Sequence, residues 1–259
     1  MPDLTPLFPL LAPFLLVLFR LVGIFAFVPF LSNSSIPGNI KIFLGVSITF
    51  CIWNVTPHVA LPAACETLPG LIVAIAGEMS VGLVIGMLLG AAFAGIQLGA
   101  HMLSQQMGLS LATIYDPSFE DQSTVIEQVG FWIALVAFLS MGGHREIINA
   151  VVYSYQTVPA GSGGLAPEAM LNAVLGGMSA SFHAATQIAM PALTAFFIAT
   201  ITSGLISRSM PQLNMMSIGI TLNLLVGMIM VALGLTGWAL VSERSLQDTF
   251  HVMGRLLGG

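Results

Sequence analysis

Charged side chains are scarce in this chain. Only 7% of its 259 residues are Asp, Glu, Lys or Arg, against about 25% in an average soluble domain. Hydrophobic residues make up 56%, and the mean hydropathy is +0.96. The six basic residues are scattered singly, whereas nucleic acid is bound by clustered Lys and Arg. The composition therefore excludes an ordinary soluble protein and a nucleic-acid partner.

Cysteine and catalytic motifs are equally scarce. Cys51 and Cys65 lie in or beside apolar sequence and form no CxxC pair, so we expect two small buried hydrophobes rather than a zinc site or a disulfide. Motifs of the types HExxH and GxSxG and a phosphate-binding glycine loop are missing. Four acids between residues 116 and 127 match no calcium loop and are interpreted as a solvated turn. We expect no catalytic residue, no cofactor and no metal.

Long apolar stretches are what the chain does have. A helix needs about 20 apolar residues to cross the roughly 30 Å hydrocarbon core of a bilayer. Stretches poor in charge form six blocks, at residues 4–31, 42–65, 79–115, 128–143, 169–207 and 209–242. They predict an all-α, membrane-associated fold of about six apolar helical blocks. Prolines within these blocks predict kinked helices, at Pro6, Pro9, Pro13 and Pro191.

A short polar break separates the last two blocks. It runs from Arg208 to Pro211, and so short a connection makes consecutive helices antiparallel neighbours. We therefore expect a C-terminal helical hairpin with Arg208, Pro211 and Gln212 at its tip. If each block spans once, basic residues divide two against three between the two sides, so the positive-inside rule gives no orientation.

Small residues recur along one face of the third block. Gly82, Gly86, Gly90 and Ala94 are four residues apart, a spacing that lets two membrane helices approach closely. Two interpretations stay open. The residues serve tight packing inside an assembly, or they serve general helix packing within one chain.

Arg20 and Glu78 are the ionisable residues most clearly embedded in apolar sequence. A charge inside a membrane helix costs about 2.5–3.5 kcal/mol on insertion scales, so each needs a partner, a water-filled cavity or an interface. They could pair with each other. A proton or ion relay is the alternative, but it needs a succession of carboxylates or histidines, and His101 and His183 are isolated in the sequence.

The polar breaks resemble those of one known family. They are Arg20-Leu21-Val22-Gly23 followed by Ser34–Lys41, then Gln106–Pro117, then Gly142–His144 followed by Thr157–Gly161, and last Arg208–Asn214 with Ile218-Gly219 beyond. In this order and at these separations they resemble the flagellar export-gate family FliR, whose counterparts serve in virulence-type injectisomes. The likeness covers about residues 20 to 235. Ile220-Thr221 departs from the Phe-Pro that the family often has there, and the flagellar version is the closer match.

The resemblance implies a role in protein export. The chain would be a non-enzymatic, core structural subunit of the flagellar type III export gate, in the bacterial inner (cytoplasmic) membrane at the flagellar basal body. The implied partners are two smaller membrane subunits in several copies, other flagellar export apparatus proteins, unfolded flagellar substrate proteins and membrane lipid. Residues 1–259 would form a single export-gate domain, in which 1–165 resembles one smaller subunit and the hairpin 173–242 resembles the other.

The second motif is implied to form a plug loop, which projects into the channel and helps to close it. The loop comprises Gly108, Leu109, Ser110, Leu111, Ala112, Thr113, Ile114, Tyr115, Asp116 and Pro117. Its apolar side chains would fill a narrow lumen, and its first and last residues would fix its ends. Without the resemblance, an ordinary re-entrant or connecting turn is the preferred interpretation.

Two other functions remain as alternatives. A small-solute membrane transporter or channel is favoured by Arg20, Glu78 and the broken helices, although the two halves show no inverted repeat. The equivalent gate subunit of a virulence-type injectisome shares the same motifs. A membrane enzyme that acts on lipid is disfavoured because acid, base and metal motifs are missing.

Overall fold

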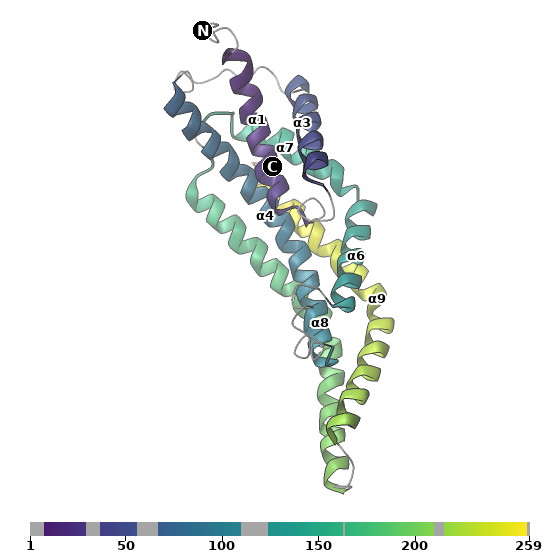
Figure 1. Ribbon diagram of the computed structural model, residues 1–259. Helices are drawn as coiled ribbons and strands as arrows, with labels where there is room; N and C mark the ends of the chain where they lie inside the picture. The colour runs from purple at the N-terminus through teal and green to yellow at the C-terminus, as the bar shows by residue number, and fades with distance from the viewer. Residues whose placement is uncertain are drawn as a thin grey trace. The chain divides into compact units, whose positions relative to one another are not determined.

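The protein is all-helical in the part of the chain that the computed structural model describes, which is residues 8–29, 37–55, 67–109, 124–162, 164–209 and 215–257. Its helices, shown in Figure 1, are α1 (Phe8–Phe27), α3 (Gly38–Val55), α4 (Leu68–Gln106), α6 (Val125–Ser140), α7 (Gly143–Thr157), α8 (Pro167–Ser209) and α9 (Met215–Leu256). These ranges contain no strand. The all-α prediction is therefore confirmed.

In its described part, each of the six predicted apolar blocks is occupied by one helix, but the boundaries differ. Helix α4 begins before Glu78 and α9 continues past Ser242, because an isolated charge interrupts an apolar run without interrupting a helix. Helix α8 continues through Arg208 to Ser209, so the polar break is shorter on that side than the sequence indicated. Pro13 and Pro191 lie inside α1 and α8.

Helix α7 was not predicted as a block. It is amphipathic rather than apolar, and it buries Ile147, Val151, Ser154 and Tyr155 along one face. A search for long apolar runs overlooks such a helix because its other face is polar.

Among the described residues, three helices are long and apolar enough to cross a membrane, namely α4, α8 and α9. Helices α6 and α7, which are separated by two residues, meet the same test when they are taken together, and α1 and α3 are shorter apolar helices. Large apolar side chains are exposed on α8 and α9, among them Phe182, Phe197, Leu205, Met228 and Leu233. Such surfaces suit lipid or partner subunits.

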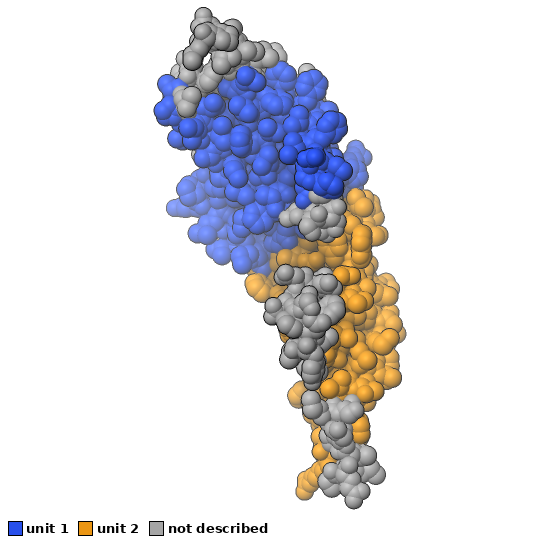
Figure 2. Space-filling view, viewed as in Figure 1, with its two compact units in different colours: residues 1–91, 142–178, 248–259 blue, residues 92–141, 179–247 orange. Residues whose placement is uncertain are grey.

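The chain divides into two compact units, coloured separately in Figure 2. Unit 1 comprises residues 1–91, 142–178 and 248–259, and unit 2 comprises residues 92–141 and 179–247. Helices α4, α8 and α9 each contribute a segment to both units. The predicted division into 1–165 and 173–242 stays a prediction.

Unit 1 has its core between α1, α4 and α7. Every fourth residue of α1 is buried, and this stripe consists of Ala12, Leu16, Arg20 and Ile24. The facing stripe of α4 includes Val81 and Ile85. Cys51 on α3 is exposed, so the expectation of a buried thiol is wrong there, since α3 leaves much of its apolar surface uncovered. Cys65 lies outside the described residues.

Unit 2 has its core between α4, α6 and α8. Phe93 of α4 lies edge-on to Phe138 of α6, with ring centroids 5.9 Å apart. Ile96 of α4 and Ala185 of α8 are fully buried as well. Aromatic pairs in this geometry contribute about 0.5–1.5 kcal/mol beyond the area that they bury.

Candidate functional site

Arg20 and Glu78 form an ion pair in the core of unit 1. Arg20 Nε donates to Glu78 Oε2 across 2.6 Å, and the two side chains are 0% and 3% exposed. Each lies within the buried stripe of its helix, α1 for Arg20 and α4 for Glu78. The pairing that the sequence left open is therefore present in the structure, and it satisfies the need of each buried charge for a partner.

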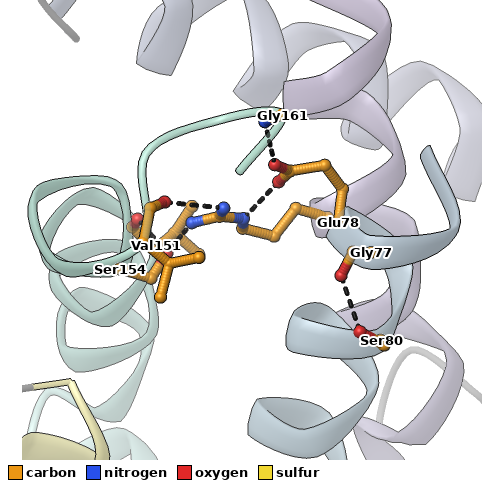
Figure 3. Close-up of polar contacts among 8 residues, drawn as sticks. Gly77, Glu78, Ser80, Val151, Ser154 and Gly161 are labelled. Atoms are coloured by element: carbon orange, nitrogen blue, oxygen red, sulfur yellow. Dashed lines mark hydrogen bonds and ion pairs between the residues drawn. The ribbon is translucent and has the colours of Figure 1, made fainter. Parts of the chain in front are cut away.

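The remaining polar atoms of the pair are bonded to α7 and to the turn after it (Figure 3). Arg20 Nη1 donates to Ser154 Oγ at 2.8 Å, and Nη2 donates to the Val158 carbonyl at 3.0 Å. Glu78 Oε1 accepts the Gly161 N–H at 2.9 Å. We call Arg20, Glu78, Ser154, Val158 and Gly161 the buried clasp. It joins α1, α4, α7 and the turn 158–161.

An aromatic ring covers the guanidinium of the clasp. Arg20 Cζ lies 3.8 Å from the centre of the Tyr155 ring, a distance typical of a cation–π contact. The Ser154 hydroxyl, which accepts from Arg20, in turn donates to the Val151 carbonyl at 2.6 Å. Because the charged atoms already have protein partners, this arrangement holds helices together rather than presenting groups to a substrate.

The glycines of α4 let α1 approach closely. A Cβ atom at Gly82 would overlap the Arg20 carbonyl, and one at Gly86 would lie 2.6 Å from the Ile24 carbonyl oxygen. At Gly90 the corresponding distance to the Phe27 carbonyl oxygen is 2.8 Å. The close contact therefore places the α1 backbone beside α4 at the level of the clasp. Ala94, the fourth residue of the predicted face, belongs to unit 2 and is exposed.

Two further glycines of α4 allow a close approach of another helix in unit 2. A Cβ atom at Gly95 would overlap the Ser181 carbonyl, and one at Gly99 would lie 2.9 Å from the Ala185 carbonyl oxygen. Both partners belong to α8. The small residues of α4 thus serve packing within the chain, against α1 in unit 1 and against α8 in unit 2.

A polar contact that was not predicted from the sequence lies in unit 2, between α4 and the start of α6. His101 Nδ1 lies 2.8 Å from Glu127 Oε1, and His101 Nε2 lies 2.7 Å from Gln105 Nε2. The Glu127 carboxylate also accepts from the Thr124 hydroxyl, which caps α6. The capping-box spacing Thr-x-x-Glu is a sequence pattern that predicts this helix start. The pairing of Glu127 with His101, 26 residues earlier, corresponds to no short sequence pattern.

Gly108 ends α4 at the beginning of the predicted plug loop. Its φ is +79°, and its N–H donates to the Gln105 carbonyl while the Leu109 N–H donates to the Ser104 carbonyl. These two bonds form a Schellman motif, in which glycine supplies the left-handed residue. Residues 110–117 of the predicted loop lie outside the described residues.

The predicted hairpin tip is described only in part. Arg208 is exposed in the last turn of α8, where a positive charge interacts favourably with the helix C-terminus. Pro211 and Gln212 lie outside the described residues.

No group of three or more metal-binding side chains occurs in the described ranges.

The fold and the clasp define a class of protein: a helical membrane protein whose buried charges join its helices. Residues 11–249 match the family model described as "Bacterial export proteins, family 1". The match covers far more than half of the chain, and the chain belongs to this family.

Curated relatives agree with the family. The chain is 28% identical over 240 residues to the flagellar biosynthetic protein FliR of Escherichia coli (strain K12), a match that covers 93% of this chain and 90% of that protein. It is 25% identical to the protein of the same name from Bacillus subtilis (strain 168), over 99% and 98% of the two chains. For the Aquifex aeolicus protein the identity is 26%, over 92% and 91%. The resemblance that the polar breaks carry is confirmed.

Proposed function

We propose that this chain is a core structural subunit of the flagellar type III protein export gate. The observation that carries this function is the match to the export family along almost the whole chain, together with full-length relatives that bear a flagellar name. The protein lies in the inner membrane at the flagellar basal body, and α4, α8 and α9 are apolar enough for that location. Its work is done together with other proteins of the export apparatus.

The finer role that we propose is to line a channel for unfolded flagellar axial proteins. Two smaller membrane subunits, in several copies, would complete this channel by packing on the exposed apolar faces of α8 and α9. The buried clasp and the close α1–α4 contact support a structural rather than a catalytic role, because their polar atoms are used to join helices. The family favours protein export over the transport of a small solute.

The plug loop from Gly108 to Pro117 is a second part of this proposal. Its support in the structure is that α4 ends at Gly108, which is the first residue of the proposed loop. The hairpin tip with Arg208, Pro211 and Gln212 is proposed to contact partner subunits, because Arg208 is exposed at the end of α8.

The test is deletion of the gene in its host, followed by an assay for hook and filament proteins in the culture supernatant. We expect these proteins to be made in normal amounts but no longer secreted, and a plasmid copy of the gene to restore secretion. If flagellar proteins were secreted normally but injected effector proteins were lost, the chain would be assigned to the export gate of an injectisome. Normal secretion of both would refute the export function.

A further inference from the structure

Helix α7 lines a cavity of unit 1 with polar side chains. The cavity has a volume of about 740 Å³, within the range of ligand pockets. Its α7 wall consists of Glu146, Asn149, Ala150, Tyr153, Gln156 and Thr157. Their spacing of three and four residues places them on one face of the helix. Two carboxamides, a phenol, a hydroxyl and a carboxylate thus face one space in a chain that is otherwise strongly apolar.

The opposite wall of this cavity comes from the last turns of α9 and is mainly apolar. It consists of Phe250, Met253, Gly254 and Leu257, again at helical spacing. The Thr157 hydroxyl donates to the Leu257 carbonyl, so the two walls are joined at one end. We call the cavity between these two walls the α7–α9 groove. It has one hydrogen-bonding side and one apolar side.

The polar side chains of the groove are available for a ligand. Glu146, Asn149, Tyr153 and Gln156 are all exposed, and Tyr153 is exposed to 59%. None of the four makes a side-chain hydrogen bond or ion pair to another residue that the structure describes. A carboxamide both donates and accepts hydrogen bonds, so this wall offers both kinds of group along the length of α7.

We propose that the α7–α9 groove binds an extended segment of the unfolded polypeptide during export, an inference that rests on the proposed function. From Glu146 to Thr157 the wall is about 16 Å long at 1.5 Å per helical residue, which matches about five residues of extended chain. An extended segment exposes its own N–H and C=O groups, and the two carboxamides can bond to them. Alternate side chains of the segment would then lie against the apolar wall.

Other occupants fit the groove less well. A lipid acyl chain has no group to bond with Asn149 or Gln156, and burying these amides beside it would cost free energy. A helix of a neighbouring subunit has its backbone N–H and C=O groups already bonded internally, so they are not free to bond to the two carboxamides. Bonds to the main chain of the ligand also tolerate many sequences, as the export of different unfolded proteins requires.

Site-specific cross-linking in the complete gate tests this proposal. A photoreactive aromatic residue replaces Tyr153, and an export substrate joined to a tightly folded domain is arrested in the gate. The control position is His144, which is also exposed on α7 but lies nine residues earlier and therefore on the opposite face. We expect the arrested substrate to cross-link to position 153 and not to position 144.

A pair of substitutions tests the role of the hydrogen bonds. Asn149→Leu with Gln156→Leu, combined with the cross-linker at position 153, should reduce the yield of the substrate adduct about tenfold, since two hydrogen bonds are lost. The matched control, His144→Leu with the same cross-linker, should leave the yield unchanged. Co-purification of the other gate subunits verifies that each variant is assembled.

The outcomes separate the groove from the export function. Cross-links from position 153 only to lipid or to another gate subunit, with the substrate demonstrably arrested, would overturn the groove while the export function stands. Equal adducts from positions 144 and 153 would do the same. Failure of the gene deletion to affect secretion would instead refute the export function, independently of any cross-link.

Discussion

Arg20 and Glu78 carry opposite charges in an apolar interior, so burial of each one is tolerated only because the other is present. Removing one partner of a buried ion pair leaves the other charge unpaired, which costs about 3–5 kcal/mol, whereas replacing both with apolar residues of similar volume is often nearly neutral. Arg20 is bonded not only to Glu78 but also to Ser154 and Val158. The clasp therefore contributes little to the net free energy of unfolding. Its main effect is to favour one arrangement of α1, α4 and α7 over others.

The clasp predicts an asymmetry between single and double substitutions. Arg20→Met alone should lower the free energy of unfolding by about 3–5 kcal/mol, because Glu78 stays buried without its cation. Arg20→Met combined with Glu78→Leu should recover most of this loss. The measurement is thermal unfolding of the detergent-solubilised protein, and a single variant as stable as the double variant would contradict the mechanism.

Residue patterns in the sequence indicated part of this site. Arg20 and Glu78 stand out because each interrupts apolar sequence, so their need for partners follows from the sequence alone. Ser154, Val158 and Gly161 carry no such mark, because a hydroxyl, a carbonyl and a backbone N–H become ligands of a charge only when the fold brings them there. The same holds for His101 and Glu127, whose contact depends on how α4 and α6 pack.

At the scale of elements, the long apolar runs predicted the apolar helices. The amphipathic helix α7 was not predicted, because its polar exposed face interrupts the apolar pattern. Three residues of the predicted face on α4, Gly82, Gly86 and Gly90, lie against α1, whereas Gly95 lies against α8 and Ala94 is exposed. Spacing identifies a close contact, but only the fold identifies the element that makes it.

The α1–α4 contact predicts opposite effects for the same substitution at two glycines. Gly82→Ala places a methyl group against the Arg20 carbonyl and should destabilise the protein by about 1–3 kcal/mol through overpacking. Gly176→Ala on α8, where nothing lies within 4 Å of the added atom, should stabilise it by about 0.5–1 kcal/mol because alanine favours the helix.

Thermal unfolding of the two variants beside the unsubstituted protein checks this prediction. Both substitutions add one methyl group to a helical glycine, so any general effect of the change cancels in the comparison. Equal shifts of the two midpoints would exclude a special role for the contact at Gly82.

The predicted C-terminal hairpin of α8 and α9 carries a prediction about assembly. Arg208→Ala combined with Gln212→Ala should reduce co-purification of the smaller gate subunits, because the proposed interface would lose an exposed charge and a carboxamide. Arg244→Ala is the matched control, since Arg244 is also exposed but lies on α9 away from the tip. Normal co-purification of the double variant would refute contacts at the tip.

At the scale of the whole molecule, two compact units share three continuous helices, and the proposed plug loop connects α4 to α6. A channel for unfolded polypeptide must be closed to ions at rest and yet be opened by its substrate. An apolar constriction meets both requirements, because it excludes water and ions by dewetting while its modest contacts are readily exchanged. The apolar residues between Leu109 and Ile114 suit this task.

Replacing residues 109–114 with Gly and Ser should therefore leave assembly intact and make the closed gate leak. The control variant exchanges Leu109, Leu111 and Ile114 for other aliphatic residues, which keeps the segment apolar and should keep the gate closed. Ion permeability of cells that produce each variant is the measurement, with co-purification of the gate subunits as the check on assembly. If the Gly and Ser variant assembles and the cells remain as impermeable as those with the aliphatic control, closure must reside in another part of the gate.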